Sequence, residues 1–166
     1  MPRARAQTRQ MIRNSESVKI FWTKFCQENP NLPIDTPYQV WFFHHNRDSS
    51  KKLVELVLQG KKKATASLME DESDFGEGGI VGGYSIVTDF DGNPQCVIVT
   101  TEVRQLPFIE VDAQFAFDEG EGDKTLEYWR NAHQRFFTEC CRELDIEFNE
   151  KLPVCCKRFK LLFPKF

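Results

Sequence analysis

The chain has 166 residues, of which 28% are charged and 40% hydrophobic, and its formal net charge is -3. A chain of this length is expected to fold as one domain, because it can bury a sufficient core without disulfides or a metal. The composition excludes a disordered or fibrous protein, the short apolar runs exclude a membrane-spanning helix, and the acid excess excludes a broad basic face that coats duplex DNA.

Basic charge is concentrated at the start of the chain. Residues 1–14 contain four arginines and no acidic residue. We expect this segment to be a flexible, solvated tail and residues 15–166 to form the folded domain. The alternatives are a transit peptide or a nucleic-acid-binding arm, whereas the segment lacks the apolar core of a secretory signal.

The next part of the chain has the pattern of two helices separated by a loop and a strand. Ser15 or Ser17 can cap the first helix, whose apolar residues recur at helical spacing until Pro30. Asp48 or one of the two following serines can cap the second helix, which Gly60 ends. The expected elements are a helix over 17–29, a proline-containing loop over 29–38, a strand over 38–43 and a helix over 51–59.

After Gly60 the pattern changes to short β segments and one long helix. Two β-rich segments are joined by the turn sequence DGNP, which predicts a hairpin. The helix carries Trp129, His133 and Phe137 at helical spacing. The expected elements are extended runs over 62–68, 82–90 and 95–103, a helix through 126–137 and a strand over 154–163. This order predicts an α+β fold with a small curved sheet or barrel.

Six cysteines occur in the sequence, with no CxxC motif and with adjacent pairs at 140–141 and 155–156. Neighbouring side chains point apart and rarely bind one zinc ion together, and His44 and His45 meet the same objection. We therefore predict reduced, mostly buried cysteines in a cytoplasmic protein, with no metal and no other cofactor.

The segment GKKKATAS, residues 60–67, is the first candidate for chemistry. In an extended segment Lys63, Thr65 and Ser67 share one face, and Lys62 lies on the other. A partly desolvated lysine close to other cations can act as a base, and a nearby hydroxyl can be the nucleophile. The alternative is a solvated basic turn at the end of the preceding helix. The segment lacks the glycines of a P-loop.

An acidic segment precedes the long helix, with Asp118, Glu119, Glu121 and Asp123 placed around two glycines. A metal site, a solvated helix start and a carboxylate for acid/base chemistry are the competing explanations. The spacing does not match a calcium loop. Glu121 and Asp123 are explained by the positive end of the helix dipole, whereas Glu119 lies too far upstream and needs another reason.

The long helix supplies the third candidate group. Arg130 could clamp a phosphate or carboxylate, and Trp129 could stack on a base. His133 lies one helical turn after Trp129. The alternative is that Trp129 belongs to the core and that His133 is a structural histidine.

These segments resemble the longer, bacterial-type branch of the ASCH domain family. The resemblance runs from about Trp41 to Phe137, and its most specific part is the EGEGD segment followed by WR and His133. It implies a PUA-like fold, which is a small β-barrel with flanking helices and a cleft at one side. It also implies an association with RNA or modified nucleosides.

The resemblance further implies an activity. Some family members are amide hydrolases that act on acetylated cytidine, and others are ribonucleases. The hydrolase lysine, threonine and glutamate fall on Lys62, Thr65 and Glu119. The family usually has Thr directly after the lysine, where this chain has Lys63, and the acidic segment here is richer, so the substrate could differ.

Three functions follow as expectations. In a hydrolase, Lys62 deprotonates Thr65, which attacks an exocyclic amide, and Glu119 orients the base. In a ribonuclease, Lys62 and Lys63 stabilise charge on a scissile phosphate. In a binding module without turnover, RNA or a nucleotide is bound but not consumed. The expected substrate-binding residues are Lys61, Lys63, Ser67, Trp129, Arg130 and His133.

Overall fold

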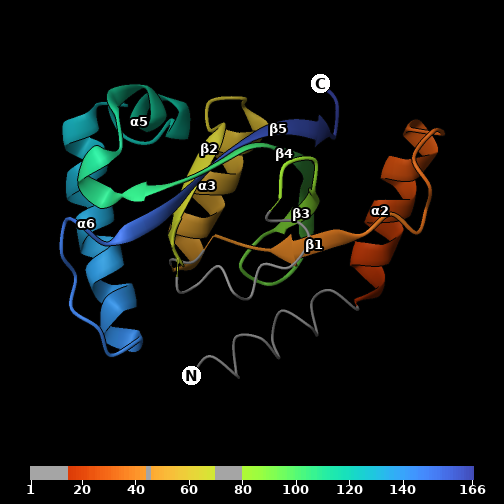
Figure 1. Cartoon of the computed structure of the whole chain (residues 1–166). Coiled ribbons are helices and arrows are strands. Elements are labelled where there is room, and N and C mark those ends of the chain that lie inside the picture. Colours follow the sequence, from red (N-terminus) through yellow and green to blue (C-terminus); the bar gives the residue numbers. More distant parts are fainter. Residues whose placement is uncertain (1–14, 44–45, 70–79) are drawn as a thin grey trace.

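The computed structural model describes residues 15–43, 46–69 and 80–166 (Figure 1). The described residues form a five-stranded mixed sheet in the order β1-β3-β4-β5-β2, with four α-helices and one 3-10 helix around it. The predicted α+β class is confirmed. The predicted closed barrel is wrong, because β1 and β2 form the two edges of the described sheet and do not pair with each other.

The elements follow the expected order, with two additions. The predicted strands and the three predicted helices are present, whereas a 3-10 helix and a short α-helix, both before the long helix, were not predicted. The tail over 1–14 and the pair at 44–45 lie outside the described residues. The bounds are α2 (Glu16–Glu28), β1 (Tyr38–Trp41), α3 (Arg47–Leu58), β2 (Ala64–Leu68), β3 (Tyr84–Thr88), β4 (Pro94–Pro107), η2 (Phe108–Glu110), α5 (Ala113–Glu119), α6 (Leu126–Glu143) and β5 (Pro153–Phe163).

Side-chain caps fix the starts of the helices. The Ser15 side chain accepts a hydrogen bond from the Val18 amide at the start of α2, as predicted. Asn46 caps α3, in place of the predicted Asp48, because its side-chain oxygen accepts from the Ser49 amide at 2.9 Å. Each cap satisfies a backbone amide that has no partner inside the helix.

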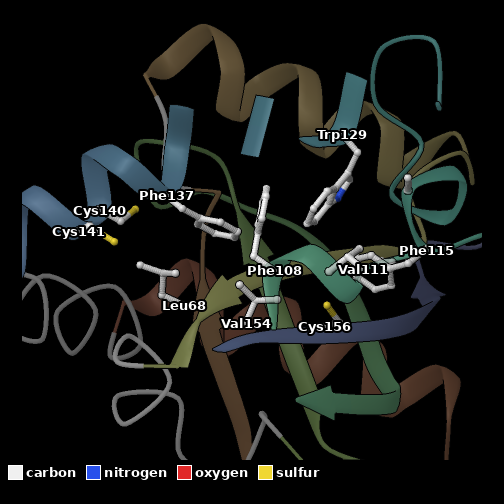
Figure 2. Close-up of a cluster of buried hydrophobic side chains, with 12 residues drawn as sticks. Leu68, Phe108, Val111, Phe115, Trp129, Phe137, Cys140, Cys141, Val154 and Cys156 are labelled. Atoms are coloured by element: carbon white, nitrogen blue, oxygen red, sulfur yellow. The ribbon is translucent and has the colours of Figure 1, made fainter. Parts of the chain in front are cut away.

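Three hydrophobic clusters hold the helices on the sheet. Helix α2 packs at one end of the molecule, and α5 and α6 pack at the other (Figure 1). Figure 2 shows the cluster beneath α5 and α6, where Trp129 and Phe137 of α6 meet Phe108 of η2 above the strands. The third cluster joins α3 to β3, β4 and β5. The candidate site residues discussed below lie where this third cluster meets the one in Figure 2.

All six cysteines are buried, which confirms the prediction of core cysteines. Cys140 and Cys141 of α6 and Cys156 of β5 contribute to the cluster in Figure 2. Among the described helices, none is both long enough and apolar enough to cross a membrane.

Candidate active site

The lysine turn is held by hydrogen bonds to three elements. The amides of Lys61 and Lys62 both donate to the Leu56 carbonyl near the end of α3, at 2.9 and 3.0 Å. The Lys63 amide donates to the Asp118 carbonyl of α5 at 2.7 Å, and the Lys63 carbonyl accepts from the Phe159 amide of β5. The turn therefore has a defined position, although it lies outside regular secondary structure.

Only the middle lysine of the turn is buried. Lys62 is 2% exposed, whereas Lys61 and Lys63 are exposed. The solvated-turn alternative therefore holds for the two neighbours and fails for Lys62. A buried ammonium group is costly unless acidic or polar partners surround it, so its contacts decide what the site is.

Two carboxylates face the Lys62 ammonium group. Its Nζ atom lies 3.0 Å from Glu121 Oε2 and 3.7 Å from Glu119 Oε1. The same nitrogen lies 5.4 Å from the centre of the Phe43 ring. Glu119 is the last residue of α5 and is 1% exposed, whereas the Glu121 side chain is 21% exposed. Glu119 is thus the inner acid of the site and Glu121 the outer one.

The second oxygen of Glu119 is held by α6. Glu119 Oε2 lies 2.8 Å from His133 Nε2 and also accepts a hydrogen bond from the Trp129 indole N–H. The Trp129 and His133 rings stack at 4.1 Å, which fixes both donors on one side of the carboxylate. Glu119 therefore connects the lysine turn to the long helix.

The hydrogen bonds of His133 determine its charge. His133 Nδ1 lies 2.9 Å from the Trp129 carbonyl oxygen, which can only accept, so Nδ1 carries a proton. His133 Nε2 faces the Glu119 carboxylate, which also accepts when it is ionised. The pair is therefore an imidazolium and a carboxylate, unless the proton sits on Glu119.

The pKa shifts select the ionised form of this pair. Burial raises the pKa of Glu119, but the neighbouring His133 and Lys62 lower it by more, so that the pKa falls to about 2. Burial lowers the pKa of His133, but the neighbouring Glu119 raises it above its ordinary value. Burial likewise lowers the pKa of Lys62, and Glu119 and Glu121 more than offset it, so the pKa is raised. The site holds two cations against two carboxylates.

The other two acids of the segment, Asp118 and Asp123, have partners outside the lysine site. Asp118 Oδ2 accepts from Arg158 Nε at 2.9 Å, and Asp123 Oδ1 accepts from the Thr125 amide at 2.9 Å just before α6. The prediction that Glu121 serves the start of the helix is wrong, because its side chain reaches back to Lys62.

Two glycines allow the loop between α5 and α6 to lie against its neighbours. Gly120 has φ of 71°, and a Cβ atom there would lie 2.1 Å from the Lys61 carbonyl oxygen. Gly122 has φ of 56°, and a Cβ atom there would lie 2.4 Å from the Tyr128 ring. Glu121 lies between these two contacts, so the glycines place its carboxylate at Lys62.

Gly120→Ala is expected to lower the free energy of unfolding by about 3 kcal/mol or more, because the loop or the lysine turn must move. Gly60→Ala is the matched control, since Gly60 has the same φ of 71° and an added Cβ would meet nothing within 4 Å. That control should cost only about 1–2 kcal/mol of backbone strain. Urea unfolding measures both variants, and equal losses would show that the loop does not press on the turn.

The predicted catalytic residues come together only in part. Lys62 and Glu119 share one buried site, as expected. Thr65 is half-buried on β2, and in the described structure it has no hydrogen bond to either of them. Ala64 and Ala66 pack toward the cluster in Figure 2, so Thr65 faces the other side of the strand.

The predicted binding residues on α6 and β2 differ in their burial and in their contacts. Trp129 is 2% exposed, so its ring is not open to stack on a base, and His133 contacts Glu119 rather than the surface. Arg130 Nη2 donates to the Ile109 carbonyl at 3.2 Å. Ser67 is half-buried on β2, on the same face as Thr65.

One group in the described residues has the geometry to hold a metal ion. Ligand atoms of Glu119, Glu121 and His133 all lie within 4.8 Å of one another. The Lys62 Nζ atom lies 3.7 Å from Glu119 and 3.0 Å from Glu121, and together with the His133 imidazolium it balances the charge of the two carboxylates. The charges of this group are therefore balanced by side chains of the protein itself.

Comparisons with known proteins agree with this architecture. A family model described as ASCH domain matches residues 39–162. The crystal structure of an ASCH domain from Lactobacillus crispatus JV V101 is 31% identical, with 89% of this chain and 95% of that chain covered and a TM-score of 0.76. The crystal structure of a protein from Enterococcus faecalis V583 is 30% identical, with 88% of each chain covered and a TM-score of 0.78.

The comparison with curated proteins found no significant match. The matched range of the family model covers most of the chain and includes Lys62, Glu119, Glu121 and His133. The element order and the two similar crystal structures agree with that match. This chain belongs to the ASCH domain family.

Proposed function

We propose that this protein is a metal-independent hydrolase that cleaves the amide of an N4-acylated cytidine or a related modified nucleoside. The observation that carries the proposal is the convergence of Lys62 and Glu119, whose charged atoms lie 3.7 Å apart in a nearly solvent-free site. Buried ionisable groups with shifted pKa values are typical of sites that transfer protons. ASCH domains are generally associated with RNA, which supports a nucleoside-type substrate.

Lys62 is positively charged before substrate binds, since its pKa is raised by the two carboxylates. A base must lose that proton. Glu121 is the more exposed of the two acids and is the one that an entering substrate can displace toward solvent. As Glu121 moves out it carries the Lys62 proton to solvent, while the His133 imidazolium continues to neutralise Glu119. Burial then favours the neutral amine, and Lys62 becomes able to accept a proton.

The reaction then proceeds through an acyl-enzyme. Neutral Lys62 takes the proton of the Thr65 hydroxyl, and Thr65 Oγ1 bonds to the amide carbonyl carbon. The C–N bond breaks as the proton passes from Lys62 to the departing exocyclic amine. Water then hydrolyses the threonine ester and releases a carboxylic acid. The mechanism requires Thr65 to approach Lys62 in the substrate complex.

A ribonuclease is the second candidate, and the charge of Lys62 favours it. A buried ammonium group that stays protonated can stabilise the negative charge that develops on a phosphate during cleavage. Exposed Lys63 would then hold a neighbouring phosphate. Neither role needs Lys62 to lose its proton.

Product analysis separates the candidate functions. The protein is incubated with acetylated cytidine and, in parallel, with single-stranded RNA, and the products are separated by chromatography. The proposed function predicts cytidine and acetate in equal amounts, with release abolished in Thr65→Val. Shortened RNA with intact acetylated cytidine would instead establish the ribonuclease. Binding of either probe without any product would leave the binding module.

Hydrolysis is expected to survive exhaustive treatment with EDTA, with less than about a twofold change in rate, because Lys62 supplies the positive charge between the two carboxylates. The measurement compares initial rates before and after chelation and after adding zinc or magnesium. Loss of activity with chelator and recovery with metal would mean that Glu119, Glu121 and His133 bind an ion in the working enzyme.

A further inference from the structure

Two exposed aromatic side chains flank the loop that carries Glu121. Phe117 on α5 is 55% exposed, and Tyr128 in the first turn of α6 is 40% exposed. Tyr128 packs its ring against Gly122, on one side of Glu121. Phe117 contacts Lys124, at the end of the same loop. Both rings therefore contact the loop that carries the outer acid of the site, whereas Trp129 is buried.

Lysine side chains lie on the loop and on the lysine turn near this aromatic pair, Phe117 and Tyr128. The ammonium group of Lys124 lies 5.1 Å from the centre of the Phe117 ring. Lys61 and Lys63 are exposed on the turn against which the loop packs. Asp118 and Glu121 are paired with Arg158 and Lys62, and Asp123 accepts hydrogen bonds from Thr125. Glu127 is exposed in the first turn of α6, so Lys124, Lys61 and Lys63 are the cations of a surface that also carries acids.

The backbone at Lys124 adds an independent observation. Lys124 has φ of 64°, a left-handed conformation that glycine adopts at no steric cost and lysine adopts rarely. Glycine occupies the other two left-handed positions of this loop, Gly120 and Gly122. A strained non-glycine residue beside a candidate site points to a use for its side chain.

We propose that Phe117 and Tyr128 form a stacking surface for a pyrimidine base, with Lys124 beside it to bind the ribose-phosphate side of the same nucleotide. This inference rests on the proposed function and identifies the part of the substrate that the site recognises. Aromatic rings stack on any base, and lysines attract phosphate, so the combination fits a nucleotide better than an apolar peptide. A base held here presents its exocyclic group toward Glu121 and Lys62.

Equilibrium binding tests the proposal without depending on turnover. The probes are acetylated cytidine, followed by calorimetry, and a fluorescein-labelled ten-nucleotide cytidine RNA, followed by anisotropy. Phe117→Ala and Tyr128→Ala are each expected to raise the Kd about tenfold, the range of one lost base–aromatic contact. Phe117→Tyr and Tyr128→Phe should keep the wild-type Kd. Phe166→Ala, at an exposed aromatic at the end of the chain, is the control.

Lys124→Gly separates binding from folding. Glycine relieves the backbone strain, so the unfolding midpoint should stay the same or rise, while the Kd for the RNA probe should increase about threefold or more with the loss of one phosphate contact. A role of Lys124 in folding alone predicts the opposite, a lower midpoint with unchanged binding.

The outcomes distinguish this inference from the proposed function. Weaker binding of both probes by the aromatic variants supports base recognition, and weaker binding of one probe identifies a free nucleoside or an RNA strand as its source. Unchanged binding in both variants, or no binding of either probe by the wild type, overturns the stacking surface. Binding that depends on Phe117 and Tyr128 without any hydrolysis overturns the enzyme and leaves the stacking surface standing.

Discussion

Lys62→Met is expected to lower turnover of acetylated cytidine about a hundredfold or more, because the variant loses the only group proposed to move the proton from Thr65 to the leaving amine. Methionine keeps most of the length and volume of the side chain, so the space next to Phe43 stays filled. Binding of the nucleoside should weaken much less than turnover. Initial rates under saturating substrate, together with the Kd, measure the two effects separately.

Lys52→Met on the exposed side of α3 is the control, since it removes the same charge from the chain away from the site. Circular dichroism must first show that Lys62→Met is folded at the assay temperature, because the variant leaves two carboxylates without their cation. Wild-type turnover in folded Lys62→Met would contradict the role of Lys62. A loss of binding equal to the loss of turnover would assign Lys62 to substrate binding instead.

The sequence was sufficient to predict most elements and the inner pair of the site. Helical spacing, caps and glycine ends identified α2, α3 and α6, and the DGNP turn identified the hairpin of β3 and β4. Lys62 and Glu119 were matched to family positions, and they meet in the fold. Periodic patterns, caps and turn sequences involve residues that are close in sequence. These elements could be predicted because their local structure depends mainly on such residues.

The unpredicted features depend on contacts between distant segments. Helix α5 has only seven residues, too few for a clear periodic pattern, and its end at Glu119 is fixed by contacts with α6 and the lysine turn. Glu121 pairs with Lys62, which lies 59 positions away in the sequence, and no local pattern indicates that contact. The position of Glu121 just before α6 was the only signal, and it suggested a role at the start of that helix. The open sheet also depends on pairing between strands, which the order of elements leaves undetermined.

The stacking role predicted for Trp129 shows how one pattern can favour two functions. Trp129, His133 and Phe137 follow one another at intervals of four residues, and that spacing places them on the face of α6 that packs against the core. The ring available to solvent is the adjacent Tyr128, which the same spacing turns outward. For aromatic residues of an amphipathic helix, regular spacing with other apolar residues indicates burial, so a ligand-stacking ring is better sought between the regular positions.

Glu119→Gln is expected to lower the free energy of unfolding at neutral pH by about 3–5 kcal/mol, the cost of removing one partner from a buried ionic group. The amide cannot neutralise Lys62 and His133, and one of its two terminal atoms is a donor that faces donors. Chemical denaturation measures the loss. Glu139→Gln on the exposed face of α6 is the control, and it should change the free energy by less than about 0.5 kcal/mol.

The pH dependence gives this prediction a second, independent signature. The pKa of Glu119 falls from 4.5 to about 2 on folding, so its contribution to stability is present above about pH 4.5 and is lost as the pH falls toward 2. The pKa of His133 rises above 6.5, so its contribution is complete below that pH and is lost as the pH rises through the higher value. The wild type should therefore be most stable between these limits. Glu119→Gln should flatten both sides of the profile, because each shift depends on the other residue. A variant that is destabilised equally at every pH would instead have lost packing alone, and the ionic connection between the lysine turn and α6 would not hold.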